Sequence, residues 1–167
     1  MTHLPDLSHV HISRVGMEDA EVFLSLIDAL ADYEHLARPD ADARRRLIAD
    51  CLGEHPRFEA FLARIEDVPV GYAITFQTYS SFLALPTQYL EDLFILPDHR
   101  KQKAGLALFL HIADLAKERD CGRMEWTVLD WNTPAQECYD ALGATHLKDW
   151  FPYRLTAKDL ATLPQRK

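Results

Sequence analysis

The 167 residues are long enough for one domain with a sizeable core, and 48% hydrophobic with 26% charged residues is typical of a globular protein. A net charge of −8 argues against a nucleic-acid partner and is compatible with a cationic substrate. No apolar run is long enough for a membrane span. Three cysteines without a C-x-x-C pair indicate neither a disulfide framework nor a zinc site, and they predict a cytoplasmic protein. His9 and His11 lack a third metal ligand, so no metal is expected.

The first half of the chain alternates strand and helix patterns. The periodicity predicts a strand at 9–15, helices at 17–33 and 39–52, and a hairpin of strands 58–65 and 70–79 with its turn at 66–69. Asp28, Asp32 and Glu34 cluster near the end of the first helix, where carboxylates oppose the helix dipole. They predict either a solvated acidic face or a patch for a cationic substrate.

A strand, a basic turn and an apolar helix occupy the centre of the chain. The strand covers 89–96, the turn is basic, and the helix runs from 103 to 119. Free N–H groups at such a turn and helix start attract phosphate. The carboxylates Glu91 and Asp92 lie on the strand just upstream, so the sequence predicts an anionic cofactor at the turn and chemistry beside the strand.

The remaining segments complete a mixed α/β sheet. They are a strand at 124–129, a helix from Thr133 as N-cap to Gly143, closing strands at 145–147 and 153–156, and a loose tail at 158–167. We expect one domain over residues 1–167, with helices on both faces of the sheet.

Three blocks of residues resemble the GNAT N-acetyltransferases. They are YLEDLFILPDHR at 89–100 with Gly105, VLDWN at 128–132 with Ala135, Tyr139 and Gly143, and GEHP at 53–56. The last block, with Tyr33 and Glu34, is similar to the spermidine/spermine (diamine) N-acetyltransferase branch. The resemblance implies a mostly antiparallel sheet of about seven strands with about four helices, acetyl-CoA as cosubstrate, and a homodimer.

The resemblance also implies a cofactor site at the strand and turn. A bulge in the strand would free backbone groups for the pantetheine arm, and the turn would bind the pyrophosphate. The implied cofactor-binding residues are Leu93, Phe94, Ile95, Arg100, Lys101, Gln102, Lys103, Ala104, Gly105, Leu106, Asn132 and Ala135. The turn departs from the family because Lys101 and Lys103 stand where glycine is common. Lysine there costs conformational freedom if φ is positive, and it adds a cation beside the pyrophosphate.

Two residues are implied as catalytic. Glu91 would act as the general base through a water molecule, since the attacking amine must be neutral. Tyr139 would be the general acid, because a phenol of pKa about 10 can protonate a thiolate. The alternative for Glu91 and Asp92 is a charge pair on an edge strand. For Tyr139 it is an aromatic packed in the helix face, which would be favoured without the spacing of Asn132, Ala135 and Tyr139.

The implied acceptor is a small primary amine. A polyamine or diamine fits the acidic residues Asp28, Glu34 and Asp92, and Trp150 and Tyr153 are candidates for lining the channel. A lysine-like or thialysine-like amino acid is the alternative, and its carboxylate would require an arginine, for which Arg57 and Arg154 are candidates. Two further alternatives remain: a non-catalytic CoA-binding module, and acetylation of a protein.

Overall fold

The computed structural model describes residues 5–164. These residues form two compact units, one ending at Thr127 and one beginning at Val128. His3 and the last three residues of the expected tail lie outside the described residues. Each unit is described by itself.

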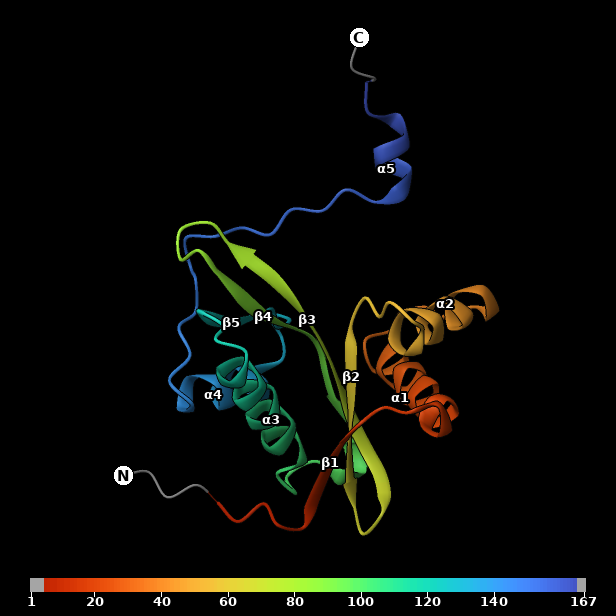
Figure 1. Cartoon of the computed structure of the whole chain (residues 1–167), viewed down its shortest axis with the longest axis vertical. Helices are drawn as coiled ribbons and strands as arrows, with labels where there is room; N and C mark the ends of the chain where they lie inside the picture. The colour runs from red at the N-terminus through yellow and green to blue at the C-terminus, as the bar shows by residue number, and fades with distance from the viewer. Residues whose placement is uncertain (1–4, 165–167) are drawn as a thin grey trace. The chain divides into compact units, whose positions relative to one another are not determined.

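The first unit is built on one five-stranded sheet in the order β1-β2-β3-β4-β5 (Figure 1). Its strands are β1 Val10–Arg14, β2 Glu59–Ile65, β3 Val68–Ser80, β4 Leu85–Ile95 and β5 Arg123–Trp126. The first four strands pair antiparallel in sequence order, and β5 pairs parallel with β4. The expected mostly antiparallel mixed sheet is confirmed.

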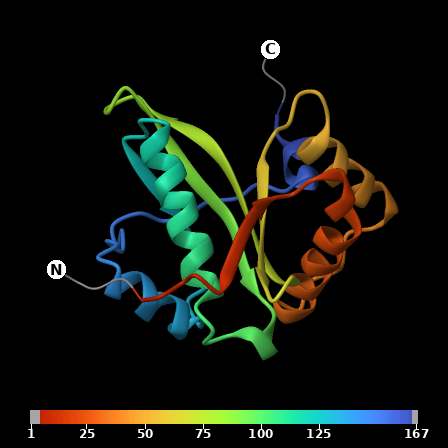
Figure 2. The ribbon, with the colours of Figure 1, turned by 60° about the horizontal axis from the view of Figure 1, so that its bottom comes forward.

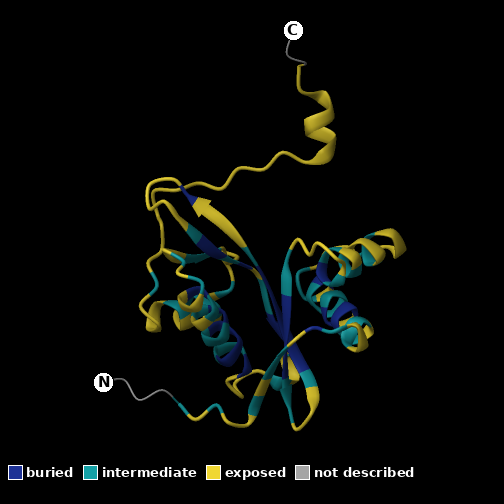
Figure 3. Cartoon of the chain, viewed as in Figure 1, coloured by how far each residue is buried: buried dark blue, intermediate teal, exposed yellow. Residues whose placement is uncertain are grey.

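Helices cover both faces of this sheet, as predicted. The short helix η1 Met17–Asp19 leads into α1 Ala20–Tyr33, and α1 and α2 Ala41–Leu52 lie on one face. The helix α3 Ala104–Glu118 lies on the other face (Figure 2). Buried residues follow the centre of the sheet and the helix sides that meet it (Figure 3). Phe23 of α1 and Tyr72 of β3 are both fully buried, with ring centroids 5.6 Å apart.

The two hairpin turns differ in position from the predicted ones. Glu66 and Asp67 alone form the β2–β3 turn, both with positive φ, as in a type I′ hairpin turn. Val68 and Pro69, expected in the turn, pair with β2 instead. The strand β4 starts at Leu85 rather than near 89, because its first residues pair with the end of β3.

The second unit contains α4 Thr133–Ala141 and α5 Ala157–Thr162. Asn132, not Thr133, is the N-cap of α4, and Gly143 follows the helix with φ +84°. The predicted closing strands at 145–147 and 153–156 are wrong, since these residues have no strand partner in the described chain. The described sheet therefore has five strands rather than about seven. The strand expected to reach Leu129 ends at Trp126.

The helix α5 replaces part of the predicted loose tail. Thr156 and Asp159 form a reciprocal capping box, in which each side chain bonds the other residue's backbone N–H. The T-x-x-D spacing is a sequence signal for a helix start that the prediction missed.

Candidate active site

A β-bulge sets the geometry of the two carboxylates on β4. Ile74 pairs with Asp92 and Thr75 pairs with Leu90, so Glu91 has no partner on β3. The buried hydroxyl of Thr75 donates to the carbonyl of Tyr89 at 2.7 Å and supports the irregular ladder. Side chains of a regular strand alternate between faces, and the extra residue breaks this alternation. The predicted bulge is confirmed.

Glu91 and Asp92 consequently line the same cleft, which has a volume of about 450 Å³. The cleft lies on the α1 and α2 face of the sheet. Its walls combine apolar side chains with three acids and one arginine: Leu47, Asp50, Arg57, Phe58, Ile74, Phe76, Glu91 and Asp92. Arg57 makes no ion pair among the described residues.

Asp92 is held in the cleft by a tyrosine. The fully buried Tyr72 donates its hydroxyl hydrogen to Asp92 Oδ2 at 3.1 Å. The pKa of Asp92 is raised to about 6, chiefly by burial; the Tyr72 hydrogen bond lowers it in part, and the neighbouring charges of Glu91 and Glu34 contribute to the rise. Burial also raises the pKa of the Tyr72 phenol, so the phenol remains a donor. Asp92 therefore changes charge near neutral pH.

Beyond Leu90 the outer edge of β4 has no strand partner in the described part of the chain. The parallel pairing with β5 runs from Thr87 to Leu90 and stops there. Leu96 N–H donates to Val70 O on β3, so the alternation of the ladder turns the backbone groups of Leu93 and Ile95 to the open side. These are the residues predicted to meet the pantetheine arm.

The basic turn after β4 has the backbone of a glycine-rich loop. Lys101 and Lys103 have φ of 66° and 65°, in the left-handed region that favours glycine. Lys103 is the N-cap of α3, whose first N–H groups face outward from the helix start. His9, in the turn just before β1, contacts the basic turn through Nε2, 2.9 Å from Gln102 O. The turn therefore holds two lysines in a backbone conformation that glycine adopts more readily.

Arg100 has contacts that the sequence did not predict. Its Nε donates to Ile95 O at 3.2 Å, and its guanidinium lies 4.3 Å from the centre of the Tyr33 ring. These contacts join the turn to α1. The remaining turn residues differ in exposure: Gln102 is exposed, Ala104 is buried, and Leu106 is half-buried.

The helix start packs closely on β4. A Cβ added at Gly105 would lie 3.5 Å from Ile95 and 3.6 Å from Leu93, which is ordinary contact. Phe94 points to the other face, into the core beside Tyr72. Packing alone therefore does not require glycine at 105, and the Phe94 ring meets the turn through the guanidinium of Arg100, 6.0 Å from its centre.

The predicted acidic patch is divided between two environments. Glu34 caps the end of α1, and its charge acts on Asp92. Asp28 binds Arg44 of α2, with both carboxylate oxygens within 2.9 Å of one guanidinium nitrogen, and it is absent from the cleft lining. Asp28 therefore ties α1 to α2.

The second unit carries the other predicted residues. Asn132 is the half-buried N-cap of α4, and Ala135 lies in its first turn. Gln136 donates to the carbonyls of Leu129 and Asp130 and fixes the segment before the helix. Burial raises the pKa of the Tyr139 phenol, which keeps it protonated at neutral pH.

Trp150 and Tyr153 lie in the irregular segment of this second unit and are 77% and 94% exposed. Among the described residues, no helix is long and apolar enough to cross a membrane. Within the same part of the chain, no group of three His, Cys, Asp or Glu residues is arranged to hold a metal ion.

Sequence reasoning missed Tyr72, Asp50 and Leu47 as lining or supporting residues of the cleft. Tyr72 stands in an apolar alternating strand, so the sequence indicates a core residue; its hydroxyl partner is known only from the register between β3 and β4. Asp50 and Leu47 lie on α2, whose orientation toward the sheet carries no local sequence signal.

Comparisons with known proteins agree with this geometry. A model of the acetyltransferase (GNAT) family matches residues 23–144. Thialysine N-epsilon-acetyltransferase of Bos taurus is 30% identical over 168 residues, covering 94% of this chain and 98% of that protein. L-ornithine N5-acetyltransferase NATA1 of Arabidopsis thaliana is 38% identical over 112 residues, covering 66% of this chain and 49% of that protein.

Two further likenesses concern the branch and the fold. Spermidine/spermine N(1)-acetyltransferase-like protein 1 of Homo sapiens is 24% identical over 92% of this chain and 24% of that protein. The integron cassette protein VCH_CASS6 of V. cholerae has the same fold, with a TM-score of 0.76 at 24% identity over 92% of this chain and 96% of that one. The chain therefore belongs to the acetyltransferase (GNAT) family, in its diamine acetyltransferase-like branch, and is an N-acetyltransferase.

Proposed function

We propose that the protein transfers an acetyl group from acetyl-CoA to the primary amine of a small acceptor. The observation that carries this proposal is the bulge, which turns Glu91 and Asp92 into one cleft beside the unpaired edge of β4. An amine entering the cleft meets two carboxylates where the activated thioester would lie.

The residues present fit acetyl-CoA, which supplies the activated acetyl group. The open backbone groups of Leu93 and Ile95 suit a pantetheine arm, and the helix start with Lys101 and Lys103 suits a pyrophosphate. Arg100, which belongs to the same turn, packs against Tyr33 of α1. Asn132 and Ala135 remain proposed cofactor-binding residues on the strength of the family resemblance.

The chemistry divides between an acid and a base. An alkylammonium has a pKa of about 10.4 and no lone pair, so it must lose a proton before attack. Glu91, free of ladder constraints, takes this proton through a water molecule, and Asp92 holds a cationic part of the acceptor. Tyr139 holds the proton that the departing thiolate requires, and its raised pKa preserves it at neutral pH.

We propose a basic amino acid, acetylated on its side-chain amine, as the acceptor. The cleft holds Asp92 and Glu91 together with Arg57, which has no ion-pair partner in the described chain. A zwitterion with an additional amine has the complementary charges: the ammonium for the carboxylates and the α-carboxylate for the guanidinium. The relatives named for thialysine and ornithine support this class.

A polyamine is the second candidate. Asp50, Glu91 and Asp92 line the cleft and Glu34 acts on Asp92, so the acidic groups outnumber the single arginine. The relative named for spermidine and spermine supports this candidate. Trp150 and Tyr153 remain proposed channel residues for either acceptor.

Matched acceptor pairs test the choice. Lysine and cadaverine, or ornithine and putrescine, differ only by the α-carboxylate. We expect Arg57→Gln to raise KM at least about tenfold for the amino acids and to leave KM for the diamines unchanged, because it removes one charge-assisted interaction. Arg46→Gln, an exposed arginine of α2, is the matched control.

Preference of the wild type for diamines would favour the polyamine candidate. Wild-type protein that binds acetyl-CoA and acetylates no amine would instead identify a CoA-binding module. We further propose that both units act as one catalytic domain, that the protein works as a homodimer, and that it is cytoplasmic.

A further inference from the structure

The loop between α2 and β2 brings two opposite charges to the acceptor cleft. Asp50 lies in the last turn of α2, and Arg57 lies just before β2. The backbone N–H of Arg57 donates to the carbonyl oxygen of Asp50 at 2.7 Å, so the two ends of the loop are joined. Both residues line the cleft that contains Glu91 and Asp92. An acid and a base therefore reach the cleft from one short loop of the first unit.

Gly53 allows the loop to close in this way. A Cβ added at Gly53 would lie 2.4 Å from the carbonyl oxygen of Ala49, which is too close for any side chain without a shift of the backbone. The N–H of Gly53 donates to the same oxygen at 2.9 Å, where α2 ends. Gly53 opens the GEHP block, so this block turns the chain and returns Arg57 to Asp50.

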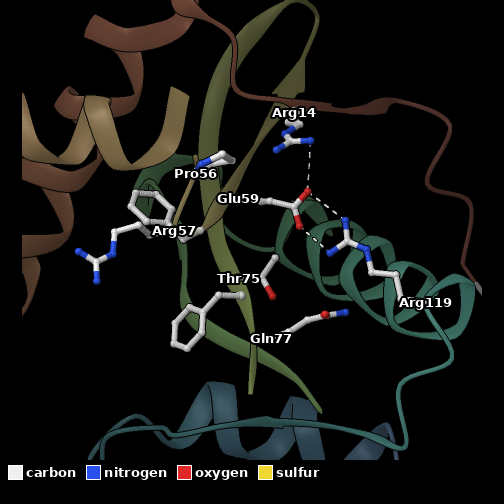
Figure 4. Close-up of a pocket in the computed structure, with 9 residues that line it drawn as sticks. Arg14, Pro56, Arg57, Glu59, Thr75, Gln77 and Arg119 are labelled. Atoms are coloured by element: carbon white, nitrogen blue, oxygen red, sulfur yellow. Dashed lines mark hydrogen bonds and ion pairs between the residues drawn. The ribbon is translucent and has the colours of Figure 1, made fainter. Parts of the chain in front are cut away.

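Neither charge forms an ion pair among residues 5–164, with the other or with a third residue. Figure 4 shows the guanidinium of Arg57 pointing away from Glu59, which binds two other arginines. Asp50 is half-buried, and a carboxylate in the last turn of a helix opposes the helix dipole. A ligand with a cation beside an anion would neutralise both side chains.

We propose that Asp50 and Arg57 form a clamp for the α-carbon end of a basic amino acid. Asp50 accepts hydrogen bonds from the α-ammonium, and Arg57 donates to the α-carboxylate. The inference rests on the proposed acetylation of a basic amino acid, and it adds Asp50 as a residue that determines specificity. The side-chain amine extends to Glu91 and Asp92 on β4. The apolar residues of the cleft suit the methylene chain: Leu47, Phe58, Ile74 and Phe76.

The charges of the acceptor during the reaction support a separate role for Asp50. The side-chain amine must lose its proton before attack, so the α-ammonium is the cation that persists through acetyl transfer. It requires a carboxylate other than the pair that receives the reacting amine. A diamine would leave Arg57 without an anion, and an ω-amino acid would leave Asp50 without a cation. Each half of the clamp therefore contributes charge-assisted hydrogen bonds that only an α-amino acid satisfies together.

Acceptors that lack one half of the head group test the clamp. Cadaverine is lysine without the α-carboxylate, and ε-aminocaproate is lysine without the α-ammonium. We expect wild-type kcat/KM to be at least about tenfold higher for lysine than for either analogue. Asp50→Asn should lower kcat/KM for lysine by at least about tenfold and should not lower it for ε-aminocaproate. Arg57→Gln should lower it for lysine and leave it unchanged for cadaverine.

Asp42→Asn is the matched control, because it removes an exposed acid that pairs with Arg45 on the same helix, outside the cleft. It should leave all three acceptors unchanged. Thermal unfolding should show that Asp50→Asn is folded, and Asp50→Glu should restore part of the preference for lysine over ε-aminocaproate. Calorimetry with CoA-loaded protein gives a readout without turnover: Asp50→Asn should raise Kd for lysine and leave Kd for CoA unchanged.

The failure of the clamp can be distinguished from the failure of the proposed function. If the wild type prefers lysine and Asp50→Asn lowers kcat/KM equally for lysine and ε-aminocaproate, the clamp is wrong and the choice of acceptor stands. Unchanged kinetics and unchanged lysine binding in Asp50→Asn have the same meaning. A wild type that acetylates diamines and neither binds nor acetylates lysine would overturn the choice of acceptor together with the clamp.

Discussion

Two clefts beside Phe76 each contain a half-buried carboxylate, and the protein treats them in opposite ways. In the cleft of about 340 Å³, Glu59 lies between Arg119, at 2.5 and 2.9 Å, and Arg14, at 3.3 Å (Figure 4). In the cleft of about 450 Å³, Asp92 has a tyrosine hydroxyl and two further acids nearby. The Arg119 hydrogen bond lowers the pKa of Glu59, whereas burial raises the pKa of Asp92 to about 6.

The difference separates a structural carboxylate from one available to a ligand. Glu59 joins the end of α3 to the ends of β1 and β2, and its charge is already neutralised. Asp92 is held in a buried position without a cation, which costs stability unless a ligand supplies the positive charge. A cationic ligand in the cleft around Asp92 would offset this cost.

The largest expected effect comes from Asp92→Asn. We expect kcat/KM for the acceptor to fall at least about 100-fold, because a buried charge pair with the ammonium is lost. The fold should become more stable above pH 6. In the wild type, the folded state binds the Asp92 proton more tightly than the unfolded state does. Stability therefore decreases as the pH rises from about 4 to 6, by up to roughly 3 kcal/mol.

Urea unfolding from pH 4 to 8 checks the stability part, and steady-state kinetics check the activity part. Asp28→Asn, which breaks the pair with Arg44 outside the cleft, is the control for removing an acid. Equal stability of Asp92→Asn and wild type at pH 7.5 would contradict the assignment of Asp92 as a destabilising charge.

Glu59→Gln should have the reverse signature. We expect the free energy of unfolding to fall by about 2 kcal/mol at pH 7. Arg119 and Arg14 would lose the charge of Glu59, whose side chain is 16% exposed and therefore little screened by solvent. Because the pKa of Glu59 is lower in the folded state, this stabilisation is fully present at pH values above the unfolded-state pKa. It is lost as the pH falls through the folded-state pKa. Asp114→Asn, in an exposed pair with Lys117, should cost less than about 0.5 kcal/mol. Thermal unfolding at pH 3 and 7 distinguishes these outcomes.

Tyr72→Phe sharpens the comparison with a smaller change. The hydroxyl lowers the pKa of Asp92, so its removal should move the acidic limb of acceptor kcat/KM from about pH 6 to higher pH. Stability should fall by about 1 kcal/mol, the usual net value of one hydrogen bond. A pH–rate profile identical to wild type would show that Asp92 does not control acceptor binding.

The contrast also explains which features of the fold and of the candidate site could be predicted from the sequence. The strand, turn and helix around Glu91 were predictable, since local periodicity and the family's motifs both depend on neighbouring residues. The partner of Glu59 was not, because Arg119 lies 60 positions away and meets it only through the packing of α3. Likewise Arg100 suggested a phosphate ligand, and its stacking on Tyr33 depends on the placement of α1. The strands expected at 145–147 and 153–156 failed because a strand requires a partner that local pattern cannot supply.

The smallest expected effect concerns a cation that, like Asp92, occupies an unfavourable position. Lys103 has φ of 65°, which glycine adopts without the steric cost paid by lysine. Lys103→Gly should stabilise the fold by about 0.5 kcal/mol, since relief of strain exceeds the added freedom of the unfolded chain. Lys103→Gln keeps the strain and should leave stability unchanged. If the lysine charge helps to bind the pyrophosphate, both variants should raise KM for acetyl-CoA by a similar, roughly threefold factor. A rise for Lys103→Gly alone would show that the backbone of the turn, rather than the charge, determines cofactor affinity.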